Sequence, residues 1–319
     1  MLIGIFGTGS IGKRHAANIQ KILPAARLIF FRENGTASET TRQFGAKVAA
    51  LDSDEIKKCQ MIIIANPSAL HCETLKKILL HNIPCYIEKP VVTETSQVQE
   101  VENLLGKYQA PSMVGCNLRF LPSLVNLKKL LDSGKIGKPI RASLEAGQWL
   151  PDWRKHVDYR NSYSADKTKG GGVIFDLIHE IDTARWLFGE FDIVKSVYGK
   201  FSDLEINSED VASIILAKSK LPPVVSINID YISRKARRKI TIIGDEGNLV
   251  WDFQNKILQV ESADNVENIE VKAEDFDVGQ TYISAMSELI AAIKGGNKTS
   301  QTIEDGLNSS RLAIKAKMI

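Results

Sequence analysis

The glycine-rich segment near the N-terminus is the feature that most constrains the fold. An apolar segment, Leu2–Phe6, runs directly into Gly7-Thr8-Gly9-Ser10-Ile11-Gly12. This order of strand, GxGxxG loop and helix is typical of a dinucleotide-binding unit, in which the glycines permit a tight turn, close approach of a pyrophosphate and close helix packing. The helix expected from Ile11 to Leu23 turns its positive N-terminal end toward the phosphates. We therefore predict that a cofactor contacts Gly7, Gly9, Ser10, Ile11 and Gly12.

Length and composition indicate a two-domain globular protein. The 319 residues are too many for one comfortable core, and the chain is 25% charged and 44% hydrophobic. The net charge of +3 argues against a dedicated nucleic-acid binder, and no apolar segment approaches the ~20 residues of a membrane helix. Because the first strand begins at Leu2, we expect no signal peptide and a cytoplasmic protein. No CxxC spacing occurs among the cysteines, so we expect reduced, buried thiols and no metal site. They are Cys59, Cys72, Cys85 and Cys116.

Strand and helix patterns alternate through residues 1–118, with short connections. This alternation predicts an α/β Rossmann domain, a doubly wound parallel sheet covered on both faces. The strands are expected at Leu2–Phe6, Leu28–Phe31, Lys47–Val48, Met61–Ala65, Cys85–Ile87 and Ser112–Val114. The helices are expected at Ile11–Leu23, Ala37–Phe44, Ser53–Lys58, Ala69–Leu80 and Ser96–Lys107.

Residues 119–319 have a different pattern, with several long strands that follow one another without helices between them. We predict an α+β domain with a large open, mostly antiparallel sheet for substrate binding and oligomerisation. Val225–Tyr231 alternates apolar and polar residues, so one face of this sheet is expected to be polar. The other strands are expected at Pro139–Gln148, Val194–Phe201, Val211–Ala217, Lys239–Ile243, Asn248–Asp252 and Ile257–Val260. Helices are expected at Leu121–Leu131, Gly171–Phe188, Gln280–Lys294 and Glu304–Lys317, and the last two are able to pack back on the first domain.

The residue after the second strand bears on the choice of dinucleotide. NAD-specific folds usually carry an acid here for the ribose 2′-hydroxyl, whereas this chain has Arg32 followed by Glu33. A guanidinium suits a 2′-phosphate, so Arg32 favours NADP. Alternatively, Glu33 accepts the ribose hydroxyl while Arg32 stacks on adenine.

Two further segments follow strands whose carboxyl ends face the ligand side of the sheet. Asn66-Pro67, with His71 one turn on, is expected beside the cofactor, although Asn66 could instead cap the following helix. In Glu88-Lys89-Pro90, the proline restricts Lys89 to an extended conformation that projects its side chain toward the nicotinamide. Partly desolvated beside a positive nicotinamide, Lys89 would exchange protons near neutrality; alternatively, it is an ordinary solvated lysine.

The helix expected at Gly171–Phe188 begins within Gly170-Gly171-Gly172, which permits close approach of another backbone or a ligand. It carries Asp176 and His179 one turn apart. The carboxylate could orient the imidazole, so that Lys89, Asp176 and His179 would line a cleft between the domains. Alternatively, the polar stripe is the solvated side of an amphipathic helix. It comprises Asp176, His179, Glu180 and Thr183.

Several of these motifs together resemble the Gfo/Idh/MocA oxidoreductases, the glucose–fructose oxidoreductase and inositol dehydrogenase family, over nearly the whole chain. The carriers are the GxGxxG loop, Asn66-Pro67 with His71, Glu88-Lys89-Pro90, Arg119-Phe120 with Pro122, Gly170 through Asp176 to His179 and Asp182, and Gly244-Asp245-Glu246-Gly247. One departure is that two residues separate Asp176 from His179 where many members have three, which leaves their division of roles open. The pattern Asp-x-x-His-Glu-x-Asp resembles that of a subgroup of the family associated with sugar-acid and glycan biosynthesis.

The resemblance implies hydride transfer between a nicotinamide and a sugar-like hydroxyl or ketone. It assigns proton transfer and substrate positioning to Lys89 and His179, with Asp176 in support, and it places a dimer or tetramer interface on the second-domain sheet. Cofactor contacts are expected from Arg32, Asn66, Pro67, His71, Glu88 and Lys89 in addition to the glycine loop.

The polar, aromatic loop from Trp149 to Lys169 is expected to contact a carbohydrate, because sugar rings stack on tryptophan and their hydroxyls bond to polar side chains. Alternatively, it is a surface loop pinned by its tryptophans. Substrate contacts are expected from Asn117, Arg119, Trp149, Trp153, Tyr159, Asp176 and His179. The basic cluster Arg234–Lys239 is expected to be a solvated hairpin turn rather than an anion site.

Two other function classes stay open. One is a non-catalytic NADP-binding regulator, which would not need proton-transfer groups. The other is NAD-assisted elimination or glycoside cleavage, in which the cofactor is recycled in place.

Overall fold

The computed structural model describes residues 1–154 and 157–318, which form two compact units. The first comprises Met1–Asn117 and Gly279–Ser310, and the second comprises Leu118–Val278 and Arg311–Ile319. Among the described residues, no helix is both long and apolar enough to cross a membrane.

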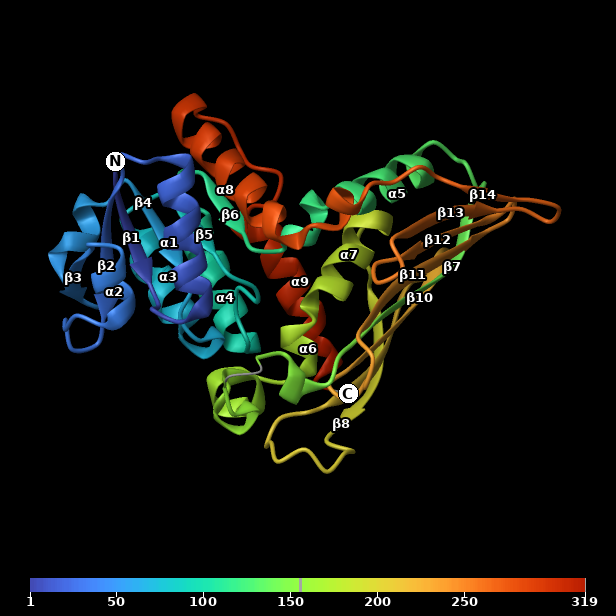
Figure 1. Ribbon diagram of the computed structural model, residues 1–319, viewed down its shortest axis with the longest axis horizontal. Helices are drawn as coiled ribbons and strands as arrows, with labels where there is room; N and C mark the ends of the chain where they lie inside the picture. Colours follow the sequence, from blue (N-terminus) through green and yellow to red (C-terminus); the bar gives the residue numbers. More distant parts are fainter. Residues whose placement is uncertain (155–156, 319) are drawn as a thin grey trace. The chain divides into compact units, whose positions relative to one another are not determined.

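The first unit is built on a parallel sheet of six strands in the order β3-β2-β1-β4-β5-β6. All four residues of β4 are fully buried, as expected for a strand with helices on both faces (Figure 1). The strands are β1 (Leu2–Phe6), β2 (Arg27–Arg32), β3 (Lys47–Ala50), β4 (Met61–Ile64), β5 (Cys85–Ile87) and β6 (Ser112–Val114). The helices are α1 (Ser10–Ile22), α2 (Glu39–Gln43), α3 (His71–Leu80) and α4 (Thr95–Leu105). The predicted doubly wound parallel sheet is confirmed.

A C-terminal segment completes the first unit. It comprises α8 (Val278–Gly295) and the first half of α9 (Ile303–Ala316). The N–H of Val114 donates to the carbonyl of Gln301. The segment after α8 therefore hydrogen-bonds to the edge strand β6. A Cβ on Gly306 would lie 2.6 Å from Val114 Cγ2, which shows how closely α9 approaches this strand.

The second unit is built on an eight-stranded sheet in the order β14-β13-β12-β11-β7-β10-β9-β8. β7 and β10 pair in parallel and the remaining neighbours are antiparallel, which confirms the predicted mostly antiparallel sheet. The strands are β7 (Pro139–Gly147), β8 (Ile193–Gly199), β9 (Val211–Lys218), β10 (Leu221–Asp230), β11 (Arg237–Gly244), β12 (Asn248–Asp252), β13 (Ile257–Glu261) and β14 (Val266–Asn268). α5 (Pro122–Asp132), α6 (Val173–Asp176) and α7 (Ile178–Phe188) pack on one face (Figure 1).

Two predicted elements differ in the structure, and one strand was not predicted. The helix expected at Gly171–Phe188 is two helices, because Leu177 (φ −100°, ψ 32°) leaves the helical conformation between α6 and α7. The helix expected at Ser53–Lys58 is a 3₁₀ turn over Asp54–Lys58. β14 was not predicted, because its exposed residues alternate no apolar side chains toward a core.

The two faces of the large sheet have different exposure. Val225, Ile227 and Ile229 of β10 are buried under the helices, whereas Val224 and Asn228 on the other face are exposed. Val197 of β8 is 70% exposed, so the open face carries apolar as well as polar side chains.

Candidate functional site

The three glycines of the GxGxxG loop have different surroundings. Gly7 has φ +107°, and a Cβ there would lie 2.3 Å from the carbonyl oxygen of Ala65. A Cβ on Gly12 would lie 2.1 Å from the carbonyl oxygen of Gly7. A Cβ on Gly9 would meet nothing within 4 Å, although its backbone is extended (φ −71°, ψ −173°) and open to any residue. The protein's own packing therefore requires Gly7 and Gly12 but not Gly9.

The N-terminus of α1 fits the phosphates of a dinucleotide. Gly9 and Ser10 are exposed, and Ile11 is partly exposed. No side chain caps the helix and its first turn holds no acid. Uncapped N–H groups at the positive end of a helix are suited to an anion, and the open space over Gly9 admits it.

The end of β2 carries the residues expected to select the dinucleotide. Arg32 is partly buried, and its guanidinium donates to the carbonyl of Thr36 in the loop that follows. Glu33 is exposed. Thr40 donates to the carbonyl of Thr8 at 3.1 Å, so α2 is held against the glycine loop.

His71 links the loops after β4 and β5. Its Nε2 lies 2.9 Å from the carbonyl oxygen of Asn66 and its Nδ1 lies 2.7 Å from that of Pro90. Burial lowers the pKa of His71, and the carbonyl contacts only partly offset this effect. The ring is 1% exposed, so the geometry favours a bracing role over direct contact with a cofactor.

Asn66 does not cap the helix that follows it. Its Nδ2 donates to Thr74 Oγ1 at 3.0 Å, and the N-cap of α3 is Leu70. Pro67 is exposed between them. The capping alternative is therefore wrong, and the side chain of Asn66 instead ties its loop to α3.

The Glu88-Lys89-Pro90 segment follows β5 directly. Lys89 is partly buried, and its peptide bond to Pro90 is cis. Glu88 is 8% exposed, and its Oε1 lies 2.7 Å from Nε2 of His15 on α1. The Glu88 carboxylate therefore faces a protein side chain. Its expected contact with the cofactor stays a prediction.

Asp176, at the end of α6, is 5% exposed and accepts hydrogen bonds from two phenols. Tyr231 donates to its Oδ2 at 2.6 Å and Tyr163 donates to its Oδ1. The two donors fix the orientation of the carboxyl group. The sequence analysis did not single out these two tyrosines. The expectation that the carboxylate orients His179 stays a prediction.

The glycines before Asp176 approach protein atoms rather than open space. A Cβ on Gly172 (φ +115°) would lie 2.3 Å from Oε1 of Glu209. The Glu209 carboxylate accepts weakly from the N–H of Ile174 in the first turn of α6, and it pairs with Lys317 at 2.9 Å. Nothing local in the sequence connects Glu209 or Lys317 to this helix.

Three of the four residues of the polar stripe, Asp176, Glu180 and Thr183, are buried, so the solvated-helix alternative is wrong. Glu180 is 4% exposed and pairs with Arg238 at 2.7 Å. Asp182 is 2% exposed and accepts from Nε and Nη2 of Arg119 at 2.8 and 2.6 Å. His179 is partly exposed in the first turn of α7.

The basic cluster after β10 is not a purely solvated turn. Arg238 reaches Glu180, and Arg237 donates to Asp230 at 3.1 Å. The guanidinium of Arg234 stacks 3.6 Å from the ring centroid of Trp149. These contacts connect the basic cluster to α7 and to the loop that begins at Trp149.

The residues expected to bind substrate also have protein partners. Asn117, 1% exposed, donates to Thr281 Oγ1 at 2.7 Å. The Trp153 ring packs edge-on against Tyr231, and its Nε1 donates to the carbonyl of Gln148. The Tyr159 hydroxyl accepts from the N–H of Glu205 at 3.2 Å. Residues 155 and 156 of this loop lie outside the described residues.

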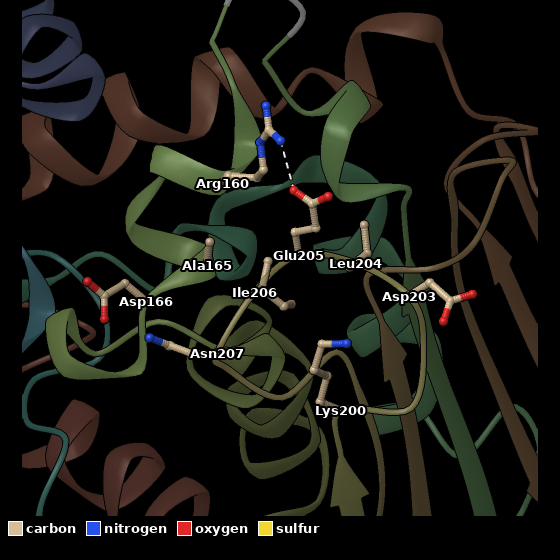
Figure 2. Close-up of a pocket in the computed structure, with 9 residues that line it drawn as sticks. All are labelled: Arg160, Ala165, Asp166, Lys200, Asp203, Leu204, Glu205, Ile206 and Asn207. Carbon is tan, nitrogen blue, oxygen red and sulfur yellow. Dashed lines mark hydrogen bonds and ion pairs between the residues drawn. The ribbon is translucent and has the colours of Figure 1, made fainter.

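An open hollow of about 630 Å³ lies where this loop meets residues 200–207 (Figure 2). Arg160 pairs across it with Glu205 at 2.8 Å, and Asn207 accepts from the N–H of Lys167 at 2.7 Å. None of the residues expected to be catalytic lines it. We interpret these contacts as a brace for the loop.

All four cysteines are buried. Among the described residues, the only group with three potential metal-ligand atoms in reach is Cys72, Glu73 and Glu100. Burial raises the pKa of Cys72 to about 11, and Lys76 bonds to both glutamates at 2.7 Å. A protonated thiol beside neutralised carboxylates is a poor metal site.

Comparison with known proteins identifies both parts of the chain. Residues 1–116 match the family described as "Oxidoreductase family, NAD-binding Rossmann fold", and residues 128–317 match "Oxidoreductase family, C-terminal alpha/beta domain". The chain is 24% identical to inositol 2-dehydrogenase of Rhizobium meliloti (strain 1021), over 98% of this chain and 94% of that protein.

Two solved structures share the fold over the full length of this chain. One is an oxidoreductase from Agrobacterium radiobacter in complex with NAD+, L-tartaric acid and magnesium (TM-score 0.83, 19% identity, 95% of that chain covered). The other is levoglucosan dehydrogenase with NADH and levoglucosan (TM-score 0.82, 21% identity, 97% of that chain covered). By its two family matches, together with the GxGxxG loop, the chain belongs to the Gfo/Idh/MocA oxidoreductase family, with an NAD(P)-binding Rossmann domain.

Proposed function

We propose that the protein transfers a hydride between a nicotinamide cofactor and a hydroxyl or ketone carbon of a carbohydrate or sugar derivative. The observation that carries the proposal is the open space over Gly9 beside the uncapped N-terminus of α1. Relatives named inositol 2-dehydrogenase, and a similar structure titled as a complex with NADH and levoglucosan, support a polyol or sugar substrate.

The bound cofactor would supply the hydride acceptor or donor. Lys89, partly buried after β5, would take the proton from the substrate hydroxyl or return it. Asp176, which accepts hydrogen bonds from Tyr163 and Tyr231, would hold the substrate together with His179. Arg119 and Asn117 would act mainly by holding their neighbours, because both are engaged with protein atoms.

The test of this function combines a substrate panel with one variant and its control. Wild-type protein is mixed with NAD+ or NADP+ and a panel of inositols, sugars and sugar acids, and absorbance is followed at the reduced-nicotinamide band. Lys89→Met should abolish turnover while cofactor affinity is nearly unchanged. Lys107→Met, at an exposed lysine after α4, is the matched control and should keep full activity. Retained turnover in Lys89→Met would refute the catalytic assignment, and binding without turnover on any substrate would favour the regulator.

For the dinucleotide, we propose NADP on the basis of Arg32. Its guanidinium lies at the end of β2, and the neighbouring acid Glu33 is exposed. The two similar structures contain NAD+ or NADH, which argues for the alternative in which Glu33 accepts the ribose hydroxyl. Arg32→Ala should weaken NADP binding and leave NAD binding nearly unchanged; tighter binding of NAD by the wild type would overturn the proposal.

We also propose that the open face of the large sheet joins two or four copies of the chain. Val197, Val224 and Ile215 are 70, 46 and 40% exposed on strands of this sheet. Grouped apolar side chains on an exposed face mark an interaction surface. Light scattering should give the mass of a dimer or tetramer for the wild type. The double variant Val197→Lys with Val224→Lys should have a lower mass in solution, and a monomeric wild type would refute the proposal.

A further inference from the structure

A buried histidine connects the helix of the glycine loop to the segment that carries Lys89. His15 lies one turn after Gly12 on α1 and is 0% exposed. Its Nε2 is 2.7 Å from Oε1 of Glu88, the residue directly before Lys89. Because a carboxylate only accepts hydrogen bonds, Nε2 is the donor.

The surroundings of Glu88 are built around its carboxylate. A Cβ on Gly115 would lie 2.9 Å from Oε2 of Glu88, so the glycine leaves room for the carboxylate in its observed position. The His15 ring packs against the rings of Tyr86 and Tyr282, at centroid distances of 4.7 and 5.9 Å. Burial, and next the charge of Glu88, raise the pKa of both tyrosines. These contacts all lie within the first unit: His15 fixes the Glu88 carboxylate, and the two tyrosine rings pack against the His15 ring.

We propose that His15 is a positioning residue that couples occupancy of the glycine loop to the placement of Lys89. The inference rests on the proposed function. The N-terminal turn of α1 would hold the pyrophosphate, and the same helix holds Glu88 through a buried, charge-assisted hydrogen bond. A shift of α1 is therefore transmitted to the residue beside Lys89. Misplacement of a catalytic group by about 1 Å can reduce the rate about 100-fold.

The kinetic test compares two His15 variants with a histidine control. His15→Leu removes the donor, whereas His15→Gln keeps an amide N–H near the position of Nε2. His81→Leu alters an exposed histidine of the same unit and should behave as the wild type. His15→Leu should lower kcat about 10- to 100-fold, with KM little changed and a larger primary isotope effect from deuterated substrate. His15→Gln should recover most of kcat. An unchanged kcat in His15→Leu would overturn the proposal.

A second test needs no turnover. The rate at which Lys89 is acetylated is followed by mass spectrometry with and without ADP-ribose, which fills the glycine loop but lacks the nicotinamide; Lys107 is the internal reference. ADP-ribose should change the Lys89 rate in the wild type and in His15→Gln, but not in His15→Leu. A response that persists in His15→Leu would contradict the coupling. A wild type with this response but no hydride transfer would refute the proposed function alone.

His15→Leu leaves Glu88 buried without its donor, so this variant could fail to fold. The double variant His15→Leu with Glu88→Leu replaces both polar groups, so no buried carboxylate is left without a donor. With a native circular dichroism spectrum, it should still show the reduced kcat and no ADP-ribose response at Lys89. Wild-type kcat in the folded double variant would overturn the proposal.

Discussion

Replacement of Gly9 by alanine tests whether the glycine loop holds a cofactor, because the structure separates this glycine from its neighbours. A Cβ at Gly9 meets no atom within 4 Å and the backbone is extended. Alanine at an N-cap costs about 1 kcal/mol relative to the better caps. The reduced entropy of the unfolded chain offsets about 0.4–1 kcal/mol of that cost. The free energy of unfolding should therefore fall by no more than about 0.6 kcal/mol, the largest difference between these two effects.

Cofactor affinity should respond very differently to Gly9→Ala. The added methyl group would occupy the space through which a pyrophosphate reaches the backbone N–H groups of α1. Loss of one hydrogen bond to a charged group costs about 1.5–3 kcal/mol. Since 1.4 kcal/mol is tenfold, Kd should rise about 10- to 150-fold. Titration calorimetry with the reduced cofactor and urea unfolding of the same preparations measure the two quantities.

Two controls bracket this prediction. Gly7→Ala places a Cβ 2.3 Å from the Ala65 carbonyl at φ +107°, so it should lose about 2–6 kcal/mol of stability through strain and overlap. Gly106→Ala adds a Cβ that meets nothing within 4 Å after α4, at a helical backbone conformation. It should leave cofactor affinity unchanged and raise the free energy of unfolding by about 0.4–1 kcal/mol. Unchanged cofactor affinity in Gly9→Ala, or a loss of stability as large as that of Gly7→Ala, would refute the reasoning.

Three further outcomes are expected. Burial lowers the pKa of His71, so the unfolded chain binds a proton more readily and stability falls as the pH drops below the unfolded value of about 6.5; the decrease in Tm between pH 7 and pH 5 should be smaller in His71→Asn, and an equal decrease would exclude His71 as its source. Tyr231→Phe removes a 2.6 Å donor to Asp176 and should lower kcat about 10- to 100-fold while Tm falls modestly, whereas a wild-type kcat would show that the contact is not needed. Gly172→Ala forces a Cβ to within 2.3 Å of Glu209 at φ +115° and should cost about 2–6 kcal/mol in urea unfolding; full stability would show that Glu209 relaxes freely.

The Rossmann sheet was predictable because its signals are local. Each of its strands is a short apolar segment bounded by helix or turn residues, and β1 and β5 match their predicted bounds. The break at Leu177 was not predictable, since apolar residues continue at helical spacing through it. The central place of β7, between β11 and β10, was also not predictable, because pairing partners about 80–105 residues away do not affect the local periodicity.

The candidate site was predictable in its residues but not in their partners. Asp176 and Glu180 could be identified as polar groups on one helix, but spacing along the chain does not show which distant side chains face them. Tyr231 is 55 residues from Asp176 in the sequence, and Arg238, which pairs with Glu180 of α7, lies on β11. Burial of a carboxylate requires such partners, so a polar stripe on a helix does not by itself indicate a solvated face.

The two glycine-rich segments show why the same residue type carries different information. From sequence, both Gly9 and Gly172 indicated close approach of a ligand or of another backbone. In the structure, the Glu209 carboxylate of the same unit fills the space that a Cβ on Gly172 would need. The corresponding space at Gly9 is open. A glycine that the protein's own packing does not require needs another reason, and at the uncapped N-terminus of a helix an approaching anion supplies it. Because Gly7 and Gly12 are needed for the fold, their variants would lose cofactor binding and stability together. Only Gly9→Ala can therefore separate cofactor binding from folding.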